Sequence, residues 1–320
     1  MKTISIPNHY NYIATFLTLD CNLACDYCIN YKDLGSLRRE IVRPSMSAKE
    51  WTSAINRLHI GRDDLPVTFQ GGEPTLHKDF YEIVNGVNGE IKLDLLTNLM
   101  FDVDEFIQEV PAYKFTREAK YAAIRASYHP GQNNIEDLIA KILKMADAGI
   151  YVGLYAVTVP ANMEHVKEVQ QRCRKLDIDF RTKEYLGFDG KNWHGTYKYP
   201  ESVSEKVEKY CECKTTELIV DPSGYVFRCH SDLYAKRQPI GHILDPDFQI
   251  EDVYRPCFMF GHCNPCDVKV KTNRFQVFGH TSVDIKDIRE LNDNEQGKLK
   301  HGNFGLGKYM FDKNKEVIRG

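Results

Sequence analysis

Short apolar runs and longer amphipathic stretches alternate along the first half of the chain. The apolar runs are rich in β-branched and aromatic residues, and the stretches between them repeat their apolar residues every three or four positions. This alternation is typical of βα units that build a parallel sheet or barrel. We expect six strands, at residues 12–19, 67–70, 91–96, 122–127, 151–159 and 180–186. The predicted fold class is therefore α/β.

Polar residues mark the starts of helices between these strands. Ser47 is followed three residues later by Glu50, a capping-box pattern in which the Ser side chain caps the helix and the Glu side chain reaches back. Further helices are predicted at residues 102–109, 135–147 and 162–176.

Cys173 lies in the last of these helices. It shares an apolar stripe with Val166, Val169 and Leu176, at spacings of three and four residues. A small buried thiol fits such a core face, so we interpret Cys173 as structural.

The composition changes at residues 187–200, which are rich in Gly, Lys, Asn, Tyr and Trp without a clear period. We interpret this segment as the connection between two regions. Beyond it, two apolar runs flank a turn at residues 221–224, which predicts a β-hairpin. The expected division is a first region at 1–195, a second region at 196–280 and a polar C-terminal tail at 281–320.

Positive and negative charges nearly balance. Lys and Arg total 42 against 45 Asp and Glu, a formal net charge of −3, so no overall positive field attracts nucleic acid or anionic lipid. The most basic stretch, residues 269–274, is interpreted as a solvated face. No uncharged run reaches the roughly 18 apolar residues of a membrane span. We expect no binding to nucleic acid or membranes.

The start of the chain lacks the cationic and apolar pattern of an export signal, so the expected location is the reducing cytoplasm. Ten cysteines in that compartment need a reason other than disulfides. Apart from Cys173, they form two clusters, at residues 21–28 and 211–266.

Cys21, Cys25 and Cys28 directly follow the first predicted strand. Barrel folds place their chemistry on such loops at the carboxyl ends of strands. The spacing lets three thiolates reach three corners of a cubic iron–sulfur cluster, and one iron is left without a protein ligand. A structural zinc ion would need a fourth ligand, and the next His or Cys offers no obvious partner. Zinc and inert buried thiols are the alternatives.

A second motif, VTFQGGEP at residues 67–74, is an apolar run that ends in two glycines, an acid and a proline. Alone it predicts only a turn after a strand. Glycines permit close approach of the backbone to a ligand, and amides and carbonyls at a strand end can bind a charged amine. Together with the C-x3-C-x2-C triad and Tyr27 before its last cysteine, the motif resembles the radical S-adenosylmethionine (SAM) superfamily.

The resemblance implies a partial (β/α)6 barrel in which Cys21, Cys25 and Cys28 hold a 4Fe-4S cluster. The open iron would bind SAM, and the cluster, reduced by a partner such as flavodoxin or ferredoxin, would cleave SAM to a 5′-deoxyadenosyl radical. The implied SAM contacts are Tyr27 beside the adenine, the motif residues Gly71, Gly72, Glu73 and Pro74, and the strand-end residues Thr97, Asn98 and Ser127. Leu99 departs from the family pattern, which has glycine there.

Six further cysteines gather in the second region: Cys211, Cys213, Cys229, Cys257, Cys263 and Cys266. The first three lie at the ends of the predicted hairpin, and the last two form a C-x2-C turn. Four thiolates from a hairpin and such a turn make a closed site, which suits zinc or an iron–sulfur cluster.

The spacing C-x12-G-x4-C followed by C-x2-C is similar to the SPASM or shorter twitch extension of radical SAM barrels, which holds auxiliary 4Fe-4S clusters. Six cysteines are too few for a full SPASM domain, so the resemblance implies one auxiliary cluster. The best match assigns Cys211, Cys229, Cys263 and Cys266, with Cys213 as an alternative to Cys211 and with Cys257 to spare.

The resemblance implies an oxidoreductase that abstracts hydrogen from a substrate carbon. A closed auxiliary cluster suits electron transfer, which favours dehydrogenation or bond formation. If Cys213 or Cys257 lay beside the substrate, its thiol would return a hydrogen and the enzyme would be an epimerase. The molybdenum-cofactor cyclase of this superfamily has a further cysteine after its C-x2-C, which this chain lacks, so that activity is not expected.

The substrate is expected to be a small molecule. The triad begins too early to leave room for the N-terminal peptide-recognition domain of many relatives. Modification of a peptide stays open as an alternative. The alternative from another class is a non-enzymatic metal-binding or electron-transfer protein.

Overall fold

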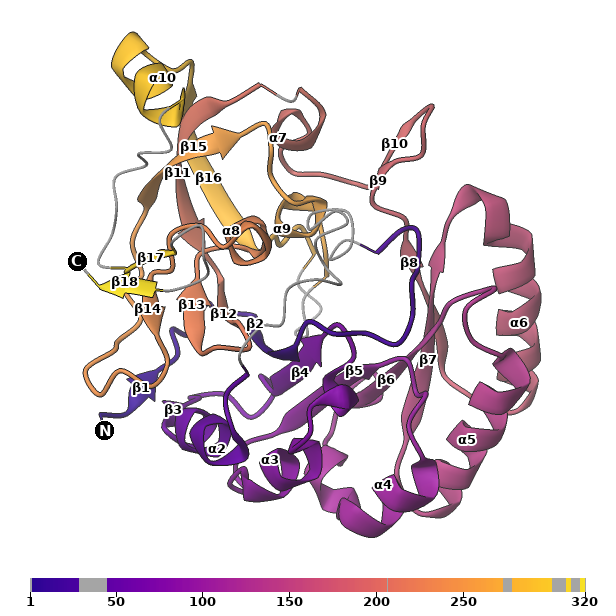
Figure 1. The fold of residues 1–320 in the computed structure, drawn as a ribbon. Coiled ribbons are helices and arrows are strands. Elements are labelled where there is room, and N and C mark those ends of the chain that lie inside the picture. The colour runs from indigo at the N-terminus through magenta and orange to yellow at the C-terminus, as the bar shows by residue number, and fades with distance from the viewer. Residues whose placement is uncertain are drawn as a thin grey trace.

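One mixed sheet connects the two regions of the chain, in the strand order β14-β13-β12-β2-β4-β5-β6-β7-β8 (Figure 1). The structure, a computed structural model, describes residues 2–28, 45–205, 207–272, 278–300, 309–311 and 317–319. Six consecutive strands of this sheet run parallel: β2 (Tyr12–Thr18), β4 (Val67–Gly71), β5 (Leu93–Thr97), β6 (Ile124–Tyr128), β7 (Val152–Thr158) and β8 (Phe180–Glu184). All six predicted strands and the α/β class are confirmed.

Helices cover the outer face of these parallel strands (Figure 1). They are α2 (Ala48–Asn56), α3 (Phe80–Gly86), α4 (Val103–Glu109), α5 (Ile135–Asp147) and α6 (Met163–Lys175), with short turns at η2 (Pro74–Leu76), η3 (Ala112–Phe115) and η4 (Pro160–Asn162). The capping box of Ser47 and Glu50 is present at the start of α2, as predicted. Trp51 and Phe106 are completely buried between helices and sheet, so the amphipathic faces predicted from the sequence form the main core.

Cys173 is completely buried on α6, beside Val166 and Val169, which confirms its structural interpretation. Leu176, which was expected on the same stripe, follows the end of the helix and is 40% exposed. The stripe therefore ends at Cys173.

The predicted hairpin extends the sheet of the first region. Its strands are β12 (Glu217–Val220) and β13 (Tyr225–Phe227), and β14 (Gly241–His242) follows β13 at the edge. Ile219 pairs with Phe227 within the hairpin and with Ala14 of β2 on its other side. The second region is therefore joined to β2 by backbone hydrogen bonds.

A separate three-stranded antiparallel sheet, in the order β15-β11-β16, carries Cys211, Cys213 and Cys257 of the second cysteine cluster. Its strands are β11 (Lys209–Thr215), β15 (Arg255–Phe260) and β16 (Val283–Arg289), and the helices beside it are α7 (Glu201–Ser204), α8 (His230–Ala235) and α9 (Pro265–Val268). The expected tail at 281–320 begins too early, because Val283 pairs with Thr215 of β11. The second region thus continues to Arg289.

The remaining elements are short. They are β1 (Ile4–Ser5), β3 (Leu58–His59), β9 (Gly187–Phe188), β10 (Trp193–His194), α10 (Asp293–Lys300), β17 (Tyr309–Phe311) and β18 (Val317–Arg319). The segment interpreted as a connection, 187–200, thus contains the small hairpin β9–β10. Within the described ranges, no helix is both long and apolar enough to cross a membrane.

Candidate functional site

The carboxyl ends of the first parallel strands surround a cavity of about 310 Å³. The thiols of the early triad, Cys21, Cys25 and Cys28, all line it. So do seven of the other predicted site residues: Tyr27, Gly71, Gly72, Glu73, Thr97, Asn98 and Ser127. Pro74 does not; it is buried as the first residue of η2, where proline is favoured. The fold therefore brings together two motifs that are distant in the sequence.

Gly71 and Gly72 hold the cysteine loop against the end of β4. The Gly72 N–H donates to the carbonyl of Thr18 at 3.0 Å, and the Glu73 N–H donates to the carbonyl of Asp20 at 2.7 Å. A Cβ at Gly71 would lie 1.9 Å from the Thr18 carbonyl oxygen, and one at Gly72 would lie 2.0 Å from that of Asp20. Glycine is thus required at both positions because the protein's own backbone lies so close. From the sequence, glycine was expected there to let the backbone approach a ligand.

The Glu73 carboxylate joins the segment after β4 to the end of β5 and is 1% exposed. One oxygen, Oε1, accepts hydrogen bonds from the N–H and hydroxyl of Thr75 and, at 2.8 Å, from the hydroxyl of Thr97. The other, Oε2, accepts from the Asn98 N–H at 2.6 Å. Burial raises the pKa of Glu73, and these hydrogen bonds act in the opposite direction. The four donors fix the shape of the cavity wall.

Asn98 connects the end of β5 to the cysteine loop. Its Nδ2 donates to Oδ1 of Asn22 at 2.6 Å and lies 4.0 Å from the sulfur of Cys21. Leu99, which follows, has a left-handed φ of 58° and is completely buried. It therefore adopts the left-handed backbone conformation for which glycine is usually needed, and burial of its apolar side chain offsets the steric cost of this conformation.

The loop after β6 supports the triad from the opposite side. Tyr27 Oη lies 2.8 Å from Nδ1 of His129, and Gln132 Oε1 accepts from the Ala24 N–H at 3.2 Å. Burial, and then the charge of Lys183, lower the pKa of His129 to about 4, so its imidazole is neutral at pH 7. His129 is not among the residues predicted from the sequence, although its position two residues after a predicted strand is a signal for a site residue.

A second cavity of about 400 Å³ adjoins the first. Four residues line both: Gln70, Leu96, His230 and Cys266. Nδ1 of His230 lies 2.7 Å from Oδ1 of Asp267, and Asp267 also accepts from the N–H groups of His230 and Ser231. Burial alone would lower the pKa of His230, but Asp267 raises it to about 9. A charged imidazole thus stands where the two cavities meet.

Three cysteines of the second region form a compact group. The sulfurs of Cys211, Cys213 and Cys257 all lie within 4.8 Å of one another, on the paired strands β11 and β15. Cys229 and Cys263 pack against the same apolar cluster. Buried thiols at this spacing match the donor set of an iron–sulfur or zinc site.

This grouping differs from the one favoured by spacing. Cys213 and Cys257, which the sequence left as an alternative and a spare, lie in the group, whereas Cys266 lines the two cavities. Which four of the six thiols bind a metal stays a prediction.

A buried cation stands beside this thiol group. Arg228 donates to Asp232 at 2.6 Å. Burial alone would lower the pKa of Arg228, but Asp232 and the neighbouring thiols raise it well above its ordinary value. The guanidinium therefore stays charged and can offset the negative charge of thiolates.

The first region of the chain matches a known protein family. Residues 15–197, more than half of the chain, match the family model described as the Radical SAM superfamily.

Curated relatives align over part of the chain. The GTP 3′,8-cyclase of Listeria welshimeri is 24% identical over 210 residues, 61% of this chain and 61% of that protein. The S-adenosylmethionine-dependent nucleotide dehydratase of Selenomonas ruminantium is 32% identical over 83 residues, 26% of this chain and 27% of that protein. The chain thus spans between about a quarter and three fifths of the length of these relatives.

Solved structures share the fold. Native anSMEcpe with bound AdoMet superposes with a TM-score of 0.51 at 15% identity, covering 73% of this chain and 78% of that chain. The same protein with AdoMet and the Kp18Cys peptide gives 0.51 at 14% identity, covering 76% and 78%. At this identity the likeness concerns the fold alone.

Proposed function

Because the chain belongs to the radical SAM superfamily, we propose that it is an enzyme that binds a 4Fe-4S cluster through Cys21, Cys25 and Cys28. SAM would bind beside the cluster in the cavity of about 310 Å³. When bound, the cluster and SAM supply a 5′-deoxyadenosyl radical by reductive cleavage of SAM. The observation that carries the proposal is that the three thiols share this cavity with the strand-end residues from β4, β5 and β6.

The chain's own residues orient the reacting groups and exclude water. Hydrogen bonds from the N–H groups of Gly72 and Glu73 hold the cysteine loop on β4. Tyr27 and His129 close the opposite side. The adjoining cavity of about 400 Å³ would hold the substrate, because four residues line both cavities and a substrate carbon there would lie next to SAM.

The second region is proposed to hold one auxiliary 4Fe-4S cluster in a SPASM- or twitch-like domain that follows a partial barrel. The group of Cys211, Cys213 and Cys257 supports a metal site there. Since Cys213 and Cys257 line neither cavity, hydrogen return by these two thiols is disfavoured and net oxidation of the substrate is favoured. An epimerase would instead need a thiol such as that of Cys266, which lines both cavities.

A small molecule is the proposed substrate. The names of the curated relatives, a GTP 3′,8-cyclase and a nucleotide dehydratase, support a nucleotide or similar molecule. The peptide in the solved anSMEcpe complex supports the alternative of a peptide substrate. The expectation that the chain is not the molybdenum-cofactor cyclase stays a prediction.

The test is anaerobic reconstitution with counts of iron and sulfide, followed by reduction with dithionite and measurement of 5′-deoxyadenosine formed from SAM. We expect about eight irons per chain for two clusters and about four in Cys25→Ala, which should form no 5′-deoxyadenosine. Cys173→Ala is the matched control, because its thiol is completely buried in the core of α6. It should keep the iron and the SAM cleavage of the wild type.

A different result would favour the non-enzymatic alternative. Zinc in the second region, together with no cleavage of SAM by any reductant, would indicate a metal-binding or electron-transfer protein.

A further inference from the structure

Basic residues outnumber acidic residues in the lining of the cavity of about 400 Å³, although the whole chain is slightly acidic. One acidic residue, Glu217, lines it. The lysines and arginines that line it are Arg125, Arg181, Lys183, Lys269 and Lys271.

The described ion-pair partners offset only part of this charge. Arg181 pairs with Asp179, and Lys271 pairs with Glu217. Arg125 shares the completely buried carboxylate of Asp94 with Arg117, so that two guanidinium groups face one carboxylate. With Lys183 and the His230–Asp267 pair left aside, the lining residues and these partners comprise five cations and three carboxylates, which leaves an excess of two positive charges.

Arg125, which lines the cavity, also has a buried donor without an acceptor. Its side chain is 12% exposed, and its Nε is buried without a hydrogen-bond partner among the described residues. A buried N–H group without an acceptor costs free energy, so Asp94 does not satisfy the whole Arg125 guanidinium.

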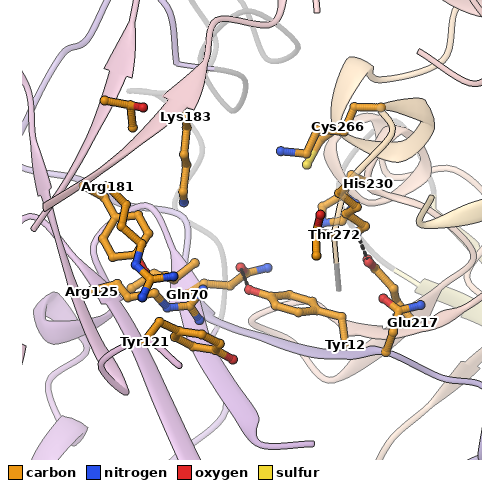
Figure 2. A pocket seen from close by; sticks show the side chains of 16 residues that line it. Tyr12, Gln70, Tyr121, Arg125, Arg181, Lys183, Glu217, His230, Cys266 and Thr272 are labelled. Atoms are coloured by element: carbon orange, nitrogen blue, oxygen red, sulfur yellow. Dashed lines mark hydrogen bonds and ion pairs between the residues drawn. The ribbon is translucent and has the colours of Figure 1, made fainter. Parts of the chain in front are cut away.

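The charges come from two walls that face each other (Figure 2). Arg125 on β6 and Arg181 and Lys183 on β8 form one wall. Lys269 and Lys271, from the second region, also line the cavity, and Lys271 pairs with Glu217 of the other wall. Figure 2 shows Lys183 pointing into the space between the barrel side and the side of Glu217 and His230.

Residues 269–274 were interpreted from the sequence as a solvated face, and this interpretation is wrong for the two lysines among them. Lys269 and Lys271 line the cavity, while Asn273 and Arg274 lie outside the described residues. The backbone that carries the two lysines is fixed, because the Val270 N–H donates to the Thr196 carbonyl at 2.7 Å and the Lys271 N–H donates to the His280 carbonyl at 2.9 Å. The two lysines are thus held at the lining of this cavity.

We propose that the substrate carries a phosphoryl group, which binds between these two walls while the rest of the molecule extends toward Gln70 and Cys266, where the cavities meet. This inference rests on the proposed function and names its substrate class, a phosphorylated small molecule. A phosphoryl group has two negative charges and three acceptor oxygens, which match several converging cations. A single carboxylate would leave more of the excess charge uncompensated.

The test is calorimetric titration of the reconstituted protein at low salt with three probes: inorganic pyrophosphate, GTP and guanosine. We expect pyrophosphate or GTP to bind and guanosine not to bind, with affinity falling as salt rises. Lys183→Gln and Lys269→Gln, which keep the length of the side chain, should each weaken binding about five- to tenfold. Lys49→Gln is the matched control, since Lys49 is exposed on α2. It should bind like the wild type.

Three results would overturn the inference. One is that neither phosphate probe binds the wild type, another is that guanosine binds as well as GTP, and the third is that the lysine variants bind like Lys49→Gln. If an acidic peptide binds while both phosphate probes fail, the cavity recognises carboxylates. Formation of 5′-deoxyadenosine by the wild type is measured on the same preparation, so failure of the proposed function is distinguished from failure of this inference.

Discussion

Oε2 of Glu73 accepts a hydrogen bond of 2.6 Å from the backbone N–H of Asn98. This contact ties the end of β4 to the end of β5, at the wall of the cavity that the cysteine triad lines. Asn98 in turn contacts Asn22 of the cysteine loop. The position of the triad therefore depends on one buried carboxylate.

Replacement of Glu73 tests this dependence. In Glu73→Gln, an amide NH2 would face N–H and O–H donors, so at least one buried donor loses its acceptor. We expect the free energy of unfolding to fall by about 1–3 kcal/mol, and SAM binding to weaken. Urea denaturation and calorimetric titration with SAM measure the two effects. Glu82→Gln, at an exposed position on α3, is the control, and equal behaviour of the two variants would contradict the prediction.

The two glycines of the motif give a second prediction. In Gly72→Ala the new Cβ would lie 2.0 Å from the Asp20 carbonyl oxygen, so the cysteine loop must move. We expect loss of the iron bound at the triad and destabilisation of about 2 kcal/mol or more. Gly89→Ala is the control, because a Cβ there would meet no described atom within 4 Å beyond its chain neighbours. Iron content and thermal unfolding measure these two effects. Normal iron content in Gly72→Ala would contradict the prediction and would show that the loop tolerates the shift.

His77 gives the protein a dependence on pH. Its Nδ1 accepts from the Asp79 N–H at 3.1 Å, and its Nε2 lies 2.9 Å from the Met46 carbonyl, an arrangement that requires the neutral ring. Burial lowers the pKa of His77 below 6.5. Its contribution to stability is therefore complete above pH 6.5 and is lost as the pH falls through the folded-state pKa.

Denaturation at pH 7.5 and 5.5 measures this contribution. The wild type should lose up to about 1.4 kcal/mol more stability between these two pH values than His77→Gln, because below pH 6.5 the unfolded chain binds a proton at this imidazole more readily than the folded protein does. His59→Gln, at an exposed position, should follow the wild type. The same loss of stability in His77→Gln as in the wild type would assign the pH dependence to other groups.

Arg57 connects the helix layer of the first region to the segment after β14. Its guanidinium donates to the carbonyls of Lys2 at 2.8 Å, Ile243 at 3.1 Å, Asp245 at 2.7 Å and Pro246 at 3.1 Å. In Arg57→Ala, one buried and three partly buried hydrogen bonds from a charged donor are lost. We expect a loss of about 2–4 kcal/mol in the free energy of unfolding.

Chemical denaturation followed by circular dichroism checks this prediction. Arg174→Ala, at an exposed position on α6, is the control and should be close to the wild type. A midpoint unchanged in Arg57→Ala would mean that the two regions are held together by the sheet alone.

Local chemistry explains what could be predicted. Ser47 and Glu50 form their capping box within one helical turn, and the triad needs only the spacing of three cysteines on one loop. The six parallel strands follow from apolar runs separated by amphipathic stretches. Each of these features depends on residues that are close in the sequence.

The sequence alone determined the strands, the helix starts, the triad and the glycine motif, because their physical causes are local. Only the tertiary structure decided that the hairpin pairs with β2, that Cys257 joins Cys211 while Cys266 faces the cavities, and that Lys269 faces a cavity. These are contacts between distant segments. They depend on how the second region packs on the sheet, and a residue's spacing from its chain neighbours carries no information about that packing.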